Sequence, residues 1–314
     1  MGRKITVFGS FVVDLMGRCP HLPVPGETVK GSLFKMGPGG KGFNQAVAAH
    51  KAGADVTMVT KVGNDTFADV AIETMTKLGM DTNRVFRSEQ AETGTALIMV
   101  DENTSQNEIA VIPGACNTIT EEEVESISDL LDQSDYLLIQ LETNLSSVEK
   151  AVEMAFEKGV KIILNTAPVQ PVGDSILKCV ELITPNEVEA GILTGITVDG
   201  EEGAGKAADY FLKKGVRNVI ITLGSKGVYI ASDKKKGILP AYQVEAVDTT
   251  GAGDAFNGGL ITALAEGKDL WEAAEFANAL AAISVQRIGT TPAMPQRSEI
   301  DAFMKSHGKE EVPC

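Results

Sequence analysis

Short, continuous apolar runs alternate with helix-period segments along most of this chain. The runs predicted as buried strands are Ile5–Phe8, Val56–Thr60, Tyr136–Leu141, Lys161–Leu164, Glu181–Ile183 and Asn218–Thr222. Several are apolar at consecutive positions, which is typical of parallel strands covered on both faces. Helical patterns lie between them near residues 43–53, 66–79, 146–158, 187–194, 201–214, 255–266 and 270–286. This alternation predicts an α/β fold with a doubly wound, mostly parallel sheet.

Two segments interrupt this alternation. Residues 12–38 contain Pro20, Pro23 and Pro25 and then a strand-like run, Thr28–Met36. Residues 94–113 contain two strand-like runs, 95–100 and 109–112, joined by a polar turn at 101–107. Together these segments predict a small additional β-sheet. It could form a lid over the main domain, or the segments could be two ordinary surface hairpins.

Polar residues follow the predicted strands at the point where each one ends. Glu142 follows Leu141 and Asn165 follows Leu164, while the segments 184–189 and 222–227 follow two later strands. Ligands of open parallel sheets bind beyond the carboxyl ends of the strands. We therefore expect a polar site along that edge of the sheet.

A glycine-rich heptapeptide, Asp248-Thr-Thr-Gly-Ala-Gly-Asp254, lies between a strand-like run, 243–247, and a helical run, 255–265. Gly251 and Gly253 have no Cβ, so a charged group can approach their backbone. The start of a helix favours an anion, and Asp254 could take a proton from a hydroxyl that attacks a phosphoryl group held there. This combination suits phosphoryl transfer. The alternative is an ordinary βα turn with an acid near the helix start.

A second glycine-rich loop, residues 36–44, opens the predicted helix near residue 43. Gly37-x-Gly39-x-x-Gly42 fits a weak dinucleotide-binding pattern, which would suit an NAD-dependent oxidoreductase. A Walker A loop is excluded because Gly42 follows Lys41 where Ser or Thr is needed. The remaining interpretations are a tight turn, or a loop that uses Lys41 and Asn44 to contact a sugar or an anion.

Composition narrows the possible partners and the compartment. The net charge of −15 argues against nucleic-acid and anionic-membrane partners, and neither a signal peptide nor a membrane span is predicted. Cys19, Cys116, Cys179 and Cys314 are far apart, which predicts no disulfide framework and favours the reducing cytoplasm. The three histidines are scattered, so a carboxylate is the expected proton acceptor.

From about Ile5 to about Phe303 the chain resembles the ribokinase, or phosphofructokinase B-type, family of ATP-dependent sugar kinases. The resemblance rests on Gly39-Gly40-Lys41-Gly42-x-Asn44, Asn186-x-x-Glu189 and the heptapeptide that ends at Asp254. It implies a kinase core formed by residues 1–11, 39–93 and 114–314. It also implies a β-lid formed by residues 12–38 and 94–113, which would pair two subunits as a homodimer.

The resemblance also implies roles for individual residues. Asp254 would be the base, and Gly251, Ala252 and Gly253 would form the anion hole. The sugar would be held by Asp14, Gly40, Lys41, Asn44, Glu142 and Asp254. ATP and Mg²⁺ would lie near Asn186 and Glu189, with Thr222, Gly224, Gly227, Gly253 and Asn278 lining the nucleotide site. A monovalent-cation site for K⁺ would use the Asp248 side chain and the backbone oxygens of Thr250, Ser284, Arg287 and Gly289.

Four residues depart from the family pattern, and the first two concern the acceptor. Val12 stands where an Asn that contacts the sugar is common, and Phe43 stands where a small residue is usual. Asn278 replaces a common His, and Ala293 replaces a Ser near the cation. The resemblance favours D-ribose as acceptor, giving D-ribose 5-phosphate. Deoxyribose, fructose, a sugar acid or a nucleoside are alternatives, and a sugar sensor without turnover is a remote one.

Overall fold

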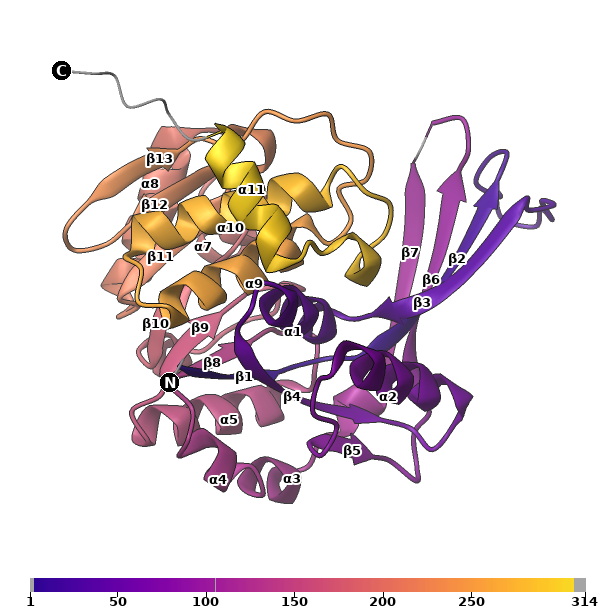
Figure 1. Cartoon of the computed structure of the whole chain (residues 1–314), viewed down its shortest axis with the longest axis horizontal. Coiled ribbons are helices and arrows are strands. Elements are labelled where there is room, and N and C mark those ends of the chain that lie inside the picture. The colour runs from indigo at the N-terminus through magenta and orange to yellow at the C-terminus, as the bar shows by residue number, and fades with distance from the viewer. Residues whose placement is uncertain (1–2, 105, 308–314) are drawn as a thin grey trace.

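The computed structural model describes residues 3–104 and 106–307. Cys314 and residue 105 of the predicted turn lie outside these ranges. The main sheet has nine strands in the order β13-β12-β11-β10-β9-β8-β1-β4-β5 (Figure 1). Their bounds are β1 (Lys4–Phe8), β4 (Asp55–Val62), β5 (Val85–Arg87), β8 (Tyr136–Ile139), β9 (Lys161–Leu164), β10 (Val180–Ile183), β11 (Asn218–Thr222), β12 (Val228–Ala231) and β13 (Lys236–Leu239). All pairs are parallel except β11–β12 and β12–β13 at one edge.

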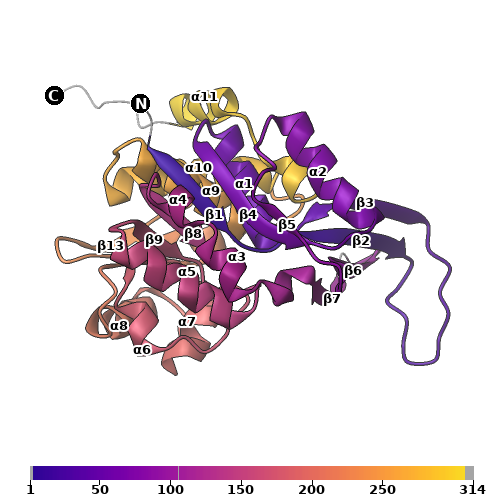
Figure 2. The same ribbon diagram turned by 90° about the horizontal axis from the view of Figure 1, so that it is seen from below.

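Helices cover both faces of this sheet (Figure 2). One face packs against α1 (Lys41–Lys51), α2 (Thr66–Leu78), α9 (Ala252–Ala265), α10 (Leu270–Ser284) and α11 (Arg297–His307). The other packs against α3 (Glu121–Glu125), α4 (Ser128–Leu131), α5 (Leu145–Glu157), α6 (Asp174–Leu177), α7 (Glu187–Thr194) and α8 (Glu201–Lys213). Alternate strand residues face the two cores: Ile5 and Val7 enter the first, and Phe8 enters the second. The predicted doubly wound, mostly parallel fold is confirmed.

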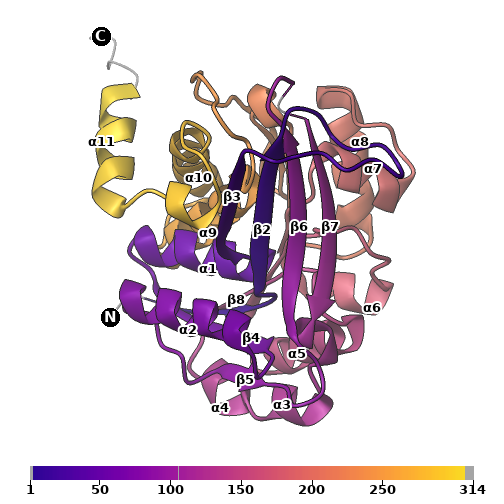
Figure 3. The same cartoon turned by 90° about the vertical axis from the view of Figure 1, so that its right-hand side faces the viewer.

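A second sheet stands beside the main one (Figures 1 and 3). Its order is β3-β2-β6-β7, with β2 (Val12–Cys19), β3 (Leu33–Gly39), β6 (Thr93–Asp101) and β7 (Asn107–Gly114). β2 pairs in parallel with β6, so the two interrupting segments form one sheet rather than two separate hairpins. The smaller β-sheet of the predicted fold class is therefore confirmed.

Several local predictions were wrong. Residues 243–247 form no strand, although they lie within the described ranges; the backbone N–H of Val247 instead donates to the carbonyl of Val285. The run predicted at 28–36 begins as a strand only at Leu33. The strand β2 was missed because its apolar residues are interrupted by Asp14, Gly17 and Arg18. The edge strands β12 and β13 and the terminal helix α11 were also not predicted.

Three short 3₁₀ turns complete the described elements: η1 (Ala115–Thr118), η2 (Gly224–Lys226) and η3 (Thr291–Ala293). Within residues 3–104 and 106–307, each helix is too short or too polar to traverse a lipid bilayer.

Candidate active site

Asp254 is a buried carboxylate in the first turn of α9, with 7% of its surface exposed. Its Oδ2 accepts a hydrogen bond from Nδ2 of Asn44 (3.0 Å), and its Oδ1 accepts one from Nε2 of Gln45 (2.9 Å). Burial raises the pKa of Asp254, while the charge of Lys41 and the two hydrogen bonds lower it. A carboxylate with a raised pKa, held by two donors that leave part of its acceptor capacity free, can serve as a base.

The start of α9 combines a left-handed glycine with an uncapped first turn. Gly251 is the N-cap residue with φ of 75°, a conformation that glycine adopts without steric cost. Within the described chain, no side chain caps this helix start. Gly253 is exposed, so an incoming group could approach its backbone. The N–H of Ala252 donates to the carbonyl of Thr249 (3.2 Å). The remaining N–H groups of a helix start form an anion site, which here lies beside the Asp254 carboxylate.

The loop between β3 and α1 depends on close backbone packing. Gly40 is the N-cap of α1 with φ of 92°, and a Cβ there would lie 2.9 Å from both the carbonyl oxygen of Ser10 and the amide nitrogen of Val12. Oε2 of Glu142 accepts hydrogen bonds from the backbone N–H of Lys41 (2.8 Å) and from the Ser10 hydroxyl. The Glu142 carboxylate thus ties the exit of β8 to the start of α1.

Asp14 reaches this region from β2 of the small sheet. Burial, followed by the charges of Glu142 and Asp254, raises the pKa of Asp14 to about 6. Its carboxylate lies against the backbone of Gly39. Hence the small sheet contributes an acidic side chain to the same site as the main domain.

Lys41 is the cation among these acids. Burial would lower the pKa of its ammonium group, but the charges of Asp254, Glu142 and Glu189 outweigh burial and raise it. Lys41 therefore stays protonated at neutral pH. The structure brings together the predicted sugar residues Asp14, Gly40, Lys41, Asn44, Glu142 and Asp254.

The predicted phosphate-side residues Asn186 and Glu189 form a capping box at the start of α7. Oδ1 of Asn186 accepts from the N–H of Glu189 (2.8 Å), and Oε2 of Glu189 accepts from the N–H of Asn186 (3.1 Å). Oε2 of Glu189 also accepts from the Thr166 hydroxyl (3.0 Å). This pair stabilises the helix start, and its carboxylate lies close enough to Lys41 to influence its pKa.

The predicted nucleotide residues lie around η2 and α10. Thr222 forms an isolated parallel bridge with Asn186, which links the exits of β10 and β11. Gly227 has φ of 102°, and a Cβ there would lie 2.1 Å from the carbonyl oxygen of Leu239. Gly224 also has a positive φ, 56°. Asn278 is buried in α10 and donates from Nδ2 to the carbonyl of Pro240 (3.3 Å).

The predicted cation residues come from two segments that are hydrogen-bonded to each other. Asp248 accepts from the N–H groups of Thr250 and Gly289, both at 2.9 Å. The N–H of Asp248 donates to the Val285 carbonyl (3.1 Å), so the segment before α9 runs beside residues 284–289. Burial would raise the pKa of Asp248, but hydrogen bonds from Thr250 and Gly289 and the charge of Arg18 lower it. The carboxylate is therefore ionised, as a cation ligand must be.

Sequence reasoning placed Asn165 at this edge of the sheet but missed three other residues that support the site: Gln45, Gln140 and Thr291. Nε2 of Gln45 also donates to Asn165 (3.0 Å), and Nε2 of Gln140 donates to Oε1 of Gln45 (2.8 Å). The Thr291 hydroxyl donates to Oδ1 of Asn44 (3.0 Å). Gln45 directly follows Asn44, and Asn165 follows a strand, so both had a positional signal. Gln140 was missed because it lay inside the run predicted as a strand, Tyr136–Leu141, whereas β8 ends at Ile139. Thr291 had no local signal.

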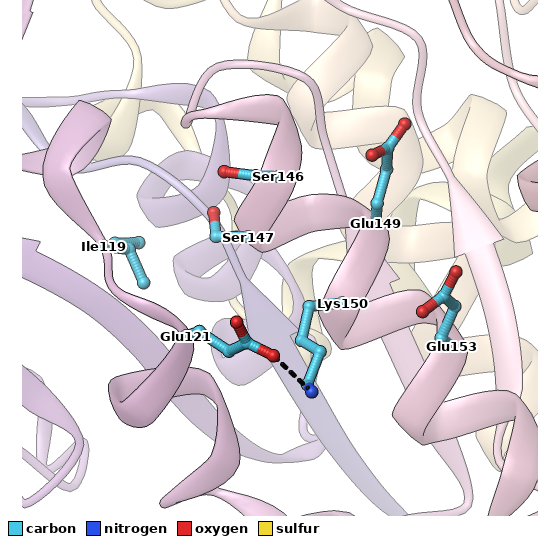
Figure 4. A pocket seen from close by; sticks show the side chains of 7 residues that line it. All are labelled: Ile119, Glu121, Ser146, Ser147, Glu149, Lys150 and Glu153. Atoms are coloured by element: carbon cyan, nitrogen blue, oxygen red, sulfur yellow. Dashed lines mark hydrogen bonds and ion pairs between the residues drawn. The ribbon is translucent and has the colours of Figure 1, made fainter.

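A separate cavity of about 310 Å³ lies beside α3 and α5, and none of its lining residues belongs to the predicted site. It is lined by Ile119, Glu121, Ser146, Ser147, Glu149, Lys150 and Glu153 (Figure 4). Nζ of Lys150 lies 2.7 Å from Oε1 of Glu121. This charged surface hollow is distinct from the cluster around Asp254.

Comparisons with known proteins show similarity along nearly the whole chain. The family model described as pfkB family carbohydrate kinase matches residues 3–297. Ribokinase from Haemophilus influenzae is 42% identical over 305 residues, covering 97% of this chain and 99% of that protein. Deoxyribokinase from Salmonella typhimurium is 36% identical over 301 residues, covering 96% and 98%. The structure of Arabidopsis thaliana ribokinase complexed with ribose and ATP has a TM-score of 0.89 at 28% identity, covering 97% of this chain and 99% of that one.

Proposed function

This chain belongs to the pfkB family of carbohydrate kinases, and we propose that it transfers the γ-phosphoryl group of ATP to the primary hydroxyl of D-ribose, giving D-ribose 5-phosphate and ADP. The observation that carries the proposal is the Asp254 carboxylate, buried beside an uncapped helix start and held by Asn44 and Gln45. Relatives named ribokinase support the choice of ribose.

Asp254 accepts the proton of the attacking hydroxyl. The hydroxyl oxygen forms a bond to the γ-phosphorus, and the bond from that phosphorus to the bridging oxygen of ADP breaks. Backbone N–H groups of Gly251, Ala252 and Gly253 stabilise the charge on the transferring group. Such pre-oriented donors are among the largest contributions to catalysis of phosphoryl transfer.

The sugar lies among Asp14, Gly40, Lys41, Asn44 and Glu142 in this proposal. A carboxylate such as Asp14 can accept hydrogen bonds from two neighbouring hydroxyls, which suits a vicinal diol. Nδ2 of Asn44 already donates to Asp254, so Asn44 would hold the base and the sugar together. Lys41 offsets the negative charge that the acids concentrate here.

ATP would lie along the exits of β10 and β11, with Thr222, Gly224, Gly227 and Gly253 around it. Asn278 would lie beside the adenine ring. A Cβ at Gly227 would collide with the carbonyl oxygen of Leu239, so this glycine lets the loop after β11 pack against the end of β13. Asn186 and Glu189, which are hydrogen-bonded to each other, would hold Mg²⁺ through water, because Mg²⁺ usually keeps several of its waters. Mg²⁺ bound there would neutralise charge on the phosphates.

A monovalent cation, K⁺, would bind the Asp248 side chain and the backbone oxygens of Thr250, Ser284, Arg287 and Gly289. The ionised carboxylate and the two hydrogen-bonded segments support this set. Because Asp248 also accepts from the N–H of Thr250, the cation would order the loop that leads into α9.

We propose that residues 12–38 and 94–113 act as a lid over a core of residues 1–11, 39–93 and 114–314. Apolar side chains exposed on the face of the small sheet opposite Asp14 support a homodimer formed through this lid: Phe34, Met36, Leu97 and Ile112. Contiguous apolar patches on a surface commonly mark interaction sites. A cytoplasmic location is proposed because Cys19, Cys116 and Cys179 are free thiols within the described residues.

Deoxyribose is the second candidate acceptor, and Val12 is the observation that favours it. Val12 lies on the same face of β2 as Asp14, is 3% exposed, and offers no hydrogen bond to a hydroxyl. A sugar that lacks one hydroxyl loses nothing at an apolar position. The Salmonella deoxyribokinase is also a close match in length.

The proposal is tested by ADP formation from Mg-ATP in potassium buffer with ribose, deoxyribose, fructose, sugar acids and nucleosides. We expect ribose to give the highest kcat/KM. The Asp254→Asn variant should keep its fold and nucleotide binding and lose roughly 10²- to 10⁴-fold in kcat. Normal turnover in this variant would refute the role of Asp254 as the base. A higher kcat/KM for another sugar would show that ribose is not the preferred acceptor.

A further inference from the structure

Three side-chain amides join the ends of neighbouring strands to Asp254. Gln140 directly follows β8, Asn165 directly follows β9, and Gln45 comes from α1. Nε2 of Gln45 donates both to Oδ1 of Asp254 (2.9 Å) and to Oδ1 of Asn165 (3.0 Å). Oε1 of Gln45 accepts from Nε2 of Gln140 (2.8 Å). Gln45, Gln140 and Asn165 are all buried.

The direction of every hydrogen bond in this cluster follows from its two ends. Nδ2 of Asn165 donates to the carbonyl of Thr184 (2.9 Å), so the Asn165 oxygen faces Gln45. An ionised Asp254 also only accepts. Gln45 must therefore turn its N–H₂ group toward both acceptors and its oxygen toward Gln140. In that orientation the Oε1 atom of Gln45 needs a donor, and Nε2 of Gln140 provides it.

The other end of the Gln140 amide is in an unfavourable environment. Its Oε1 is buried and has no hydrogen-bond partner among residues 3–104 and 106–307. A Cβ on Gly9 would lie 2.1 Å from that oxygen, so the amide is packed directly against a glycine backbone. Buried acceptors without partners are uncommon and unfavourable. A role for the donor side of the same amide accounts for the arrangement.

We propose that Gln140 is a positioning residue for phosphoryl transfer: it fixes the Gln45 amide so that Gln45 donates to Asp254 and holds this carboxylate in line with the attacking hydroxyl. The inference rests on the proposed role of Asp254 as base. Gln140 acts through Gln45 and makes no hydrogen bond to Asp254 itself within the described residues.

The electrostatics around Asp254 give this role a measurable signature. Burial raises the pKa of Asp254, and the charge of Glu142 raises it further. The charge of Lys41 and the hydrogen bonds from Gln45 and Asn44 lower the pKa of Asp254. The carboxylate of Asp14 also lies within range of this charge. Weakening the Gln45 hydrogen bond therefore raises the pKa of the base, and the acidic limb of the pH–rate profile moves to higher pH.

The test compares Gln140→Met, Gln140→Glu and Asp254→Asn in the full chain. Gln140→Met removes the donor with little change in size. We expect its kcat to fall about 10-fold with the sugar KM within about twofold, because only positioning in the transition state is lost. The acidic limb of kcat should move up by about half a pH unit or more. Gln140→Glu adds a competing acceptor and should have the larger effect.

Thr6→Val is the matched control. Thr6 is buried on β1, and its hydroxyl shares a hydrogen bond with Ser134 (2.7 Å) away from Asp254. The Thr6→Val substitution should lower the melting temperature without moving the acidic limb of the pH profile of kcat. Unchanged kcat and acidic limb in a folded Gln140 variant, beside an inactive Asp254→Asn, would overturn the positioning role alone. An active Asp254→Asn variant would overturn the role of Asp254 as the base, and with it the positioning role of Gln140.

Discussion

Gly39 and Asp14 are packed so closely that a Cβ on Gly39 would lie 2.3 Å from Oδ1 of Asp14 and 2.5 Å from Oδ2. Gly39 ends β3, and Asp14 lies on the adjacent strand β2. The missing Cβ is therefore the space that the Asp14 carboxylate occupies. The conformation of the Asp14 side chain, which is predicted to bind the sugar, therefore depends on Gly39.

Gly39→Ala should weaken sugar binding without unfolding the protein. The Asp14 side chain is flexible and can rotate away from the new methyl group, but it then leaves its place in the site. A lost hydrogen bond to a charged group corresponds to about a 10- to 100-fold rise in the sugar KM. Steady-state kinetics with a thermal melt measure both effects. Gly37→Ala is the control, since a Cβ there meets nothing within 4 Å in the described chain.

The raised pKa of Asp14 predicts a pH-dependent sugar affinity. The folded-state pKa is about 6, above the ordinary value of 3.8, because burial and nearby acids favour the protonated form. An ionised Asp14 accepts from sugar hydroxyls, so the sugar KM should rise as the pH falls through about 6. Measuring KM from pH 5 to 8 checks this. In Asp14→Asn the KM should be high throughout, and an unchanged inflection there would assign the titration to another group.

Replacing sodium by potassium at equal ionic strength should raise kcat and leave the sugar KM nearly unchanged. The reason is that the proposed cation residues lie around Asp248, which binds the N–H of Thr250 just before the helix start, away from the sugar. Asp248→Asn should reduce the difference between the two salts, because the amide has no negative charge. Equal kcat in potassium and sodium chloride for the unaltered protein would rule out a potassium-selective site.

The exposed apolar residues of the small sheet predict a dimer that polar substitutions disrupt. Phe34 is 67% exposed and Leu97 is 48% exposed, and both lie on the face of the sheet opposite Asp14. Sedimentation of Phe34→Ser/Leu97→Ser should show monomers at concentrations where the unaltered chain is dimeric. Phe156→Ser, at a 49% exposed position on α5, should leave the assembly intact. A monomeric unaltered chain at micromolar concentration would contradict the dimer.

The local patterns predicted the main sheet well because buried parallel strands are short apolar runs. The predicted strands at 161–164 and 218–222 coincide with β9 and β11. The extended run at 243–247 has the same appearance, but its backbone pairs with the segment after α10 rather than with a strand. Strand propensity describes a half-buried surface and does not specify a partner.

The sequence by itself determined the alternation of the central parallel strands with helices, the chemistry of the glycine turns and the carboxylate at Asp254. It also carried the motifs by which the family is recognised. Only the tertiary structure decided which distant residues meet: Asn44 and Asp254 lie 210 positions apart and share a hydrogen bond, and Gln140 reaches Asp254 only through Gln45. The physical reason is that such contacts depend on where separate strand ends converge in space. Local periodicity, which reflects burial and hydrogen bonding within one element, places polar residues at the strand ends but does not specify which of them make contact.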